Sequence, residues 1–154
     1  MSKSLISKSL ISKSLVSKNL KSMNNFKKLI VWQKSRELVK DIYLITKGFP
    51  KEELFGLTSQ IRRATISIAL NIAEGSGRGT DKDFVHFLDI AFGSALEVEA
   101  QIILSSDLEF ITNDEYDILN LKIQEIQKMI KKLIDSIQNK MSNSLASNSL
   151  VSKI

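Results

Sequence analysis

One stretch of the chain carries polar side chains at helical spacing. In the segment QIRRATISIALNIAEGSGR, which begins at Gln60, amides, hydroxyls and charged groups recur every three or four residues. These residues are Gln60, Arg63, Ser67, Asn71, Glu74 and Arg78. A helix brings residues at these intervals onto one face. Such a face can form a hydrogen-bonded contact with another helix or subunit, or bind phosphate through its arginines.

A second polar row follows about thirty residues later. Ser94, Glu97 and Gln101 are spaced for one helical face and lie among small residues that permit close approach. We predict that the two rows form a polar contact between helices or subunits, because buried polar groups fix register and partner choice. The alternative is an ordinary solvated face.

The residue sets that catalysis needs are missing from the sequence. The chain has one histidine, His86, and no cysteine, so one chain cannot build a His/Cys metal cluster. The glycines of EGSGRG are typical of a helix end, with an anion-binding nest closed by Arg78 as the alternative. We therefore predict no catalytic residue, no metal site and no cofactor, and we interpret His86 as a surface or interface residue.

Four helices are predicted to position the two polar rows. Apolar residues recur at three- and four-residue intervals over about residues 29–47, 50–76, 81–106 and 113–140, and short links favour an antiparallel up-down-up-down topology. The sequence thus predicts an all-α four-helix bundle. The predicted inward residues are Val31, Ser35, Leu38, Ile42, Ile45 and Phe49, then Leu54, Leu57, Ile61, Ala64, Ile68 and Ile72, then Phe84, Leu88, Ala91, Ala95, Val98 and Ile102, and finally Leu119, Ile123, Ile126, Ile130, Leu133 and Ile137.

Composition bounds the class of protein. A chain of 154 residues suits one domain with a single core. The absence of cysteine fits a reducing cytoplasm, and no apolar run approaches the roughly 20 residues that a membrane span needs. The basic N-terminus lacks the unbroken apolar stretch of a signal peptide. We expect a cytoplasmic protein without a membrane partner.

The net charge of +5 belongs to the ends of the chain. Residues 1–28 carry seven lysines and no acid, whereas residues 29–140 carry 14 Lys/Arg and 17 Asp/Glu. Charge is also segregated within the predicted bundle, since residues 29–51 have a net charge of +3 and residues 83–110 have six acids and no Lys/Arg. Charges separated in this way should find complements inside the bundle or across a subunit boundary.

Both ends of the chain are repetitive. The repeat SKSLI recurs through the first 22 residues and returns as SNSLA and SNSLV near the C-terminus. A five-residue period matches neither a helix nor a strand, so we predict low-complexity, disordered or weakly ordered tails at 1–25 and 141–154 around a bundle domain at 26–140. Two alternatives remain: a lysine-bearing arm that contacts phosphate, or translation that begins at Met23.

Three segments resemble a known family. LIVWQKSRELVKDIYLITKGFP, LTSQIRRATISIALNIAEGSGR and FVHFLDIAFGSALEVEAQI resemble the four-helix bundle proteins encoded in 23S ribosomal RNA intervening sequences, over about residues 26–140. The family is similar to the accessory variability determinant proteins of diversity-generating retroelements, which implies a homopentamer that binds nucleic acid and a reverse transcriptase. The characteristic positions that match are Trp32, Gln60, Arg62, Arg63, Ser67, Asn71, Glu74, Gly75, Arg78, Ser94 and Glu97.

Two functions follow as predictions. The first is a non-enzymatic, RNA-associated oligomer, in which phosphates meet the basic side chains Arg62, Arg63, Arg78, Lys34 and Arg36. The second is a homo-oligomeric scaffold without direct nucleic-acid binding, whose subunits meet through Gln60, Arg63, Ser67, Asn71, Glu74, Ser94, Glu97 and Gln101. An enzyme is the least favoured class.

Overall fold

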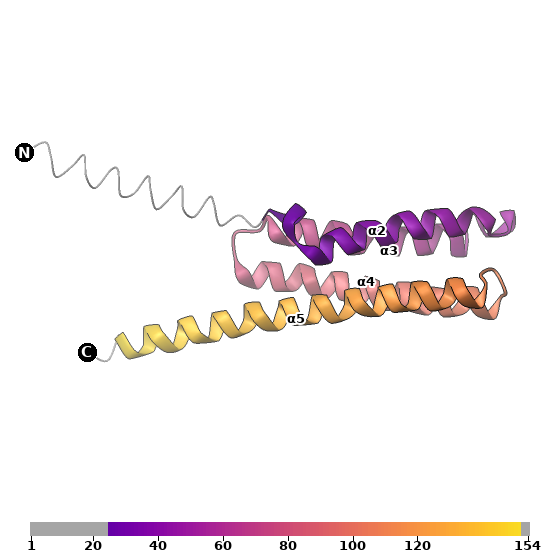
Figure 1. The fold of residues 1–154 in the computed structure, drawn as a ribbon. Coiled ribbons are helices and arrows are strands. Elements are labelled where there is room, and N and C mark those ends of the chain that lie inside the picture. The colour runs from indigo at the N-terminus through magenta and orange to yellow at the C-terminus, as the bar shows by residue number, and fades with distance from the viewer. Residues whose placement is uncertain (1–24, 152–154) are drawn as a thin grey trace, which may run out of the picture.

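The apolar spacing of the sequence produces four long helices that pack side by side (Figure 1). The computed structural model describes residues 25–151, with side chains described to residue 146. Consecutive helices contact one another, and the last helix also contacts the first, which closes the bundle. The predicted all-α, antiparallel four-helix bundle is confirmed. Its helices are α2 (Ile30–Ile45), α3 (Leu57–Ser76), α4 (Asp81–Asp107) and α5 (Asn113–Val151), with short 3-10 turns η1 (Phe26–Lys28), η2 (Thr46–Gly48) and η3 (Lys51–Glu53).

The core lies between the inner faces of the four helices. On α4, every predicted inward residue from Phe84 to Ile102 is buried. On α5, Ile134 is buried, whereas the predicted Leu133 and Ile137 only pack against the edge of the core. Each fully buried aliphatic side chain contributes roughly 1.5–3 kcal/mol of transfer free energy, so these inner faces hold the bundle together.

The start of α3 differs from the sequence prediction. We predicted a helix from about residue 50 with Leu54 facing the core, but α3 begins at Leu57, and Leu54 is 52% exposed. The chain first makes the short turn η3, and the Glu53 carboxylate then accepts a hydrogen bond from the Leu57 backbone N–H at 3.0 Å. Glu53 therefore caps the helix from outside instead of lying within its first turn.

The start of α4 agrees with the prediction, and the end of α5 extends beyond it. The Thr80 hydroxyl accepts a hydrogen bond from the Asp83 backbone N–H at 3.0 Å, as an N-cap residue does. Helix α5 continues past residue 140 to Val151, and the side chains of residues 142–146 are exposed. Residue 140 thus marks the end of packing against the bundle instead of the end of the helix. The N-terminal repeat and residues 152–154 lie outside the described residues.

Candidate functional site

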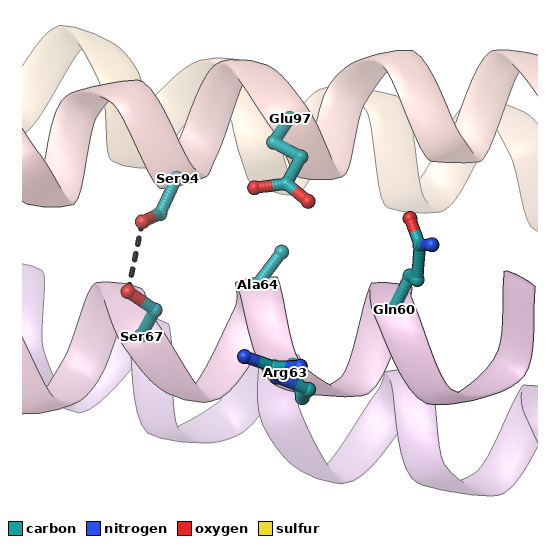
Figure 2. A pocket seen from close by; sticks show the side chains of 6 residues that line it. All are labelled: Gln60, Arg63, Ala64, Ser67, Ser94 and Glu97. Atoms are coloured by element: carbon teal, nitrogen blue, oxygen red, sulfur yellow. Dashed lines mark hydrogen bonds between the residues drawn. The ribbon is translucent and has the colours of Figure 1, made fainter. Parts of the chain in front are cut away.

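The predicted polar rows meet in a groove between α3 and α4 (Figure 2). The groove has a volume of about 300 Å³. Six residues line this groove: Gln60, Arg63, Ala64, Ser67, Ser94 and Glu97. Ala64 is the one lining residue that the polar pattern did not include. In the sequence, only its place in the apolar stripe indicated that Ala64 lies close to α4.

One end of the groove is closed by hydrogen bonds. The Ser67 and Ser94 hydroxyls lie 2.9 Å apart and join α3 to α4 (Figure 2). The Asn71 side-chain amide donates to the carbonyl oxygen of Ser67 at 2.8 Å and to its hydroxyl at 3.0 Å. These polar side chains therefore find hydrogen-bond partners within the same chain, and their bonds fix the register of the two helices.

The charged residues of the groove, Arg63 and Glu97, do not find ion-pair partners in the described part of the chain. Arg63 and Glu97 both line the groove, and Glu97 points from α4 toward Ala64 on α3 (Figure 2). Among residues 25–151, neither of the two forms an ion pair, and Arg63 has neither a hydrogen bond nor an aromatic neighbour. Among the described residues, the groove therefore presents one cation without a partner, Arg63, and one exposed carboxylate without an ion pair, Glu97.

Gln101 links the groove to the buried interior. It is only 6% exposed, and its side-chain amide N–H donates to the Glu97 carboxylate at 3.2 Å. The oxygen of the same amide is buried and has no hydrogen-bond partner in the described part of the chain. An unsatisfied buried acceptor costs about 1–3 kcal/mol, and because this oxygen is shielded from the groove surface, the cost is borne by the folding of the chain.

An apolar surface adjoins the groove on α4. Gly93, Glu97, Ala100 and Leu104 follow one another at spacings of four, three and four, so the edge of the groove continues into the outer face of α4. Large aliphatic side chains on this outer face are exposed, with Leu96 at 47%. We call this surface the α4 outer face, and its large residues are Ile90, Leu96, Ile103 and Leu104. The predicted surfaces did not include the α4 outer face, and the signal for it in the sequence was that these apolar residues fall outside the inward stripe.

The five basic residues predicted to contact nucleic acid do not gather at one place, and four of them interact with other side chains of the chain. The Arg62 guanidinium donates to the Thr46 hydroxyl at 2.8 Å and lies over the Tyr43 ring. Arg78 forms an ion pair with Glu74. Lys34 reaches Glu125 on α5 at 3.0 Å, and Arg36 lies 5.9 Å from the centre of the Trp32 ring. Of the five predicted residues, Arg63 alone lacks a partner among the described residues.

The remaining predicted positions do not join the groove. Glu74 turns to Arg78, four residues along the chain, instead of lining the hollow. His86 is exposed and packs edge-on against the Phe87 ring. Within residues 25–151, no cluster of three or more His, Cys, Asp or Glu side chains is placed to hold a metal ion, and no helix is long and apolar enough to cross a membrane.

Comparison with known proteins identifies a family model and a similar solved structure. The chain matches the family model described as 23S rRNA-intervening sequence protein over residues 27–132, a range that includes every residue lining the groove. It is also similar to a protein with unknown function from the S23 ribosomal protein family of Bacteroides thetaiotaomicron, with 31% sequence identity and a TM-score of 0.63. That similarity covers 69% of this chain and 96% of the other. No curated protein matches the sequence.

Proposed function

The chain belongs to the family of 23S rRNA-intervening sequence proteins, and on that premise we propose that it is a non-enzymatic homo-oligomer. Its subunits meet through the groove and the α4 outer face. One observation carries this proposal: Arg63, which has no partner among the described residues, and the exposed carboxylate of Glu97, which forms no ion pair among them, border an exposed apolar surface. A second copy of the chain would cover the apolar surface and supply the missing polar partners.

The charge distribution supports a head-to-tail arrangement of subunits. Helix α2 contacts α3 and α5, and α4 contacts the same two helices, so α2 and α4 occupy opposite corners of the bundle. The α2 region is basic, with five Lys/Arg and two acids in residues 29–51, whereas residues 83–110 have six acids and no Lys/Arg. Opposite charges on opposite faces favour contacts between different surfaces of neighbouring subunits, and such contacts form a ring when the rotation between subunits closes. A ring of five subunits is the number that we propose from the family resemblance.

Thiol protection tests the proposed contact surface. The chain has no cysteine, so Leu96→Cys places a single thiol on the α4 outer face. We expect this thiol to react slowly with a thiol reagent at high protein concentration and faster on dilution. The matched control is Leu145→Cys, at an exposed position where α5 extends beyond the bundle. Equal reaction rates for the two thiols at every concentration would contradict the proposal.

RNA association is the second function that we propose. It is supported by the family description, which refers to 23S rRNA, and by the seven lysines of residues 1–28. Phosphate contacts by Lys and Arg release counterions, so log affinity should fall linearly with log salt, with a slope of about −0.7 per contact for single strands. Binding of a structured RNA by the full chain across a salt series measures this slope. A flat response, or no binding at low salt, would exclude direct RNA contact.

A further inference from the structure

The end of the bundle opposite the start of α2 combines an excess of acidic residues with exposed apolar side chains. It consists of the α2–α3 connection and the α4–α5 connection with their flanking turns, residues 47–56 and 104–121, which we call the distal end (Figure 1). The Phe49 and Phe110 rings lie 5.4 Å apart and hold the two connections together. The distal end carries seven acids and two lysines, a net charge of −5.

Large apolar side chains at the distal end face solvent. Phe55 is 91% exposed, and five aliphatic side chains of the same end are at least half exposed. They are Leu54, Leu104, Leu108, Ile118 and Leu121. Carboxylates of Glu52, Asp107, Glu109 and Asp114 are exposed among them. Exposed apolar groups on this scale mark an interaction surface, and the surrounding carboxylates select a basic partner.

The sequence contains a segment with the complementary chemistry. Residues 1–24 carry five lysines and no acid, a side-chain charge of +5. Four of the five lysines stand two positions before a leucine, and an isoleucine or valine follows three of these four leucines. Each repeat unit can therefore place an ammonium group beside a carboxylate while its aliphatic side chains cover exposed apolar surface.

The length of this segment permits the contact. A chain of 24 residues spans at most about 80 Å when extended. Helix α4, with 27 residues, is about 40 Å long. The segment joins the bundle at η1, where α2 begins, so it can reach the distal end of its own subunit or of a neighbour.

We propose that the N-terminal repeat, residues 1–24, docks on the distal end. The lysines pair with the exposed carboxylates, and the aliphatic residues pack on Leu54, Phe55 and Leu108. Docking and phosphate binding use the same lysines, so a polyanion would displace the repeat from the bundle. Of the exposed apolar residues at the distal end, only Leu104 also belongs to the α4 outer face, so the repeat can dock whether or not the subunits associate through the groove.

Paramagnetic broadening in the full chain tests the docking directly. Ser9→Cys introduces a single thiol to which the spin label is attached, because the natural chain has no cysteine. Isotope-labelled methyl groups of Leu54, Leu108 and Ile118 report the distal end, and Ile30 reports the end where the repeat joins the bundle. We expect the three distal methyl groups to lose at least about half of their intensity in about 0.01 M salt and to recover in about 1 M salt, where the Debye length falls from about 30 Å to about 3 Å. Broadening confined to Ile30, or absent everywhere, would overturn the proposal.

A charge-reversal pair separates specific docking from general attraction. Asp107→Lys with Glu109→Lys should abolish the broadening at the distal end. Glu37→Lys with Asp89→Lys makes the same change of charge at exposed positions on α2 and α4, and should leave the broadening intact. If the control pair abolishes the broadening equally, the docking site is wrong. Mixing spin-labelled chains with isotope-labelled chains then shows whether the repeat docks on its own subunit or on a neighbour, and either result supports the proposal.

Discussion

The two faces of helix α3 differ in how far contacts within one chain bury or pair their side chains. On the inner face, Ile61, Ile68 and Ile72 are at most 1% exposed and fill the core. On the groove face, Arg63 lies in the open without a partner among the described residues. The inner face is complete within one chain, whereas the groove face is complete only where Ser67, Asn71 and Ser94 bond to one another. Folding of one chain therefore accounts for the first face, and the second is the face that we propose to be covered by another copy.

The largest effect is expected on the inner face. Ile68→Ala removes a fully buried side chain and leaves a cavity between the helices, which should lower the free energy of unfolding by about 2–5 kcal/mol. Urea denaturation of the variant and the wild type measures the difference. A loss below about 1 kcal/mol would mean that the inner face of α3 is not a close-packed core.

A pair of glycines compares the inner and outer surfaces directly. A Cβ atom at Gly75 would lie 2.7 Å from the Phe87 Cβ and 2.9 Å from the Phe84 ring, because α3 and α4 approach closely there. Gly75→Ala should therefore destabilise the bundle by about 1–3 kcal/mol. At Gly93, on the α4 outer face, a Cβ would meet no atom within 4 Å. Gly93→Ala should gain about 0.5–1 kcal/mol from helix propensity. Equal signs for the two variants in thermal unfolding would contradict the assigned packing.

Two neighbouring arginines separate folding from assembly. Arg62 bonds to Thr46 and lies over Tyr43, so Arg62→Ala should lower the free energy of unfolding by about 1 kcal/mol and leave the oligomeric mass unchanged. Arg63→Ala removes the free cation of the groove and should lower the oligomeric mass in light scattering. The matched exposed control, Lys82→Ala, should change neither quantity. If Arg62→Ala rather than Arg63→Ala reduces the mass, the assignment of the groove is reversed.

The smallest effect concerns the hydroxyl pair that joins α3 to α4. Ser67→Ala and Ser94→Ala should each destabilise modestly, and their double-mutant cycle should show a coupling of about 0.5–1 kcal/mol, since the two hydroxyls lie 2.9 Å apart. Chemical denaturation of the four proteins gives the coupling. Strict additivity would show that the hydrogen bond does not contribute to the register of the helices.

The sequence predicts the helices and both polar rows because their spacing is local. The 3.6-residue period locates the apolar residues of the inner face of α4, although not the buried polar residues Gln101 and Ser105, and it places Ser67 and Ser94 on faces that meet. It does not locate the start of α3, because the Glu53 cap depends on a turn whose geometry no periodicity encodes. It also does not show that Arg62 and Arg63, adjacent in sequence, face a tyrosine ring and an open groove. That difference depends on how α2 packs against α3, which is a long-range property.

The mass of the full chain in solution tests the central claim most directly. One subunit has a mass of 17.3 kDa. Light scattering of the wild-type protein over a dilution series should give an integral multiple of this mass at high concentration, five subunits in the proposed ring, and should approach one subunit only on strong dilution. A mass of 17.3 kDa at every concentration would show that the groove and the α4 outer face do not join copies of this chain.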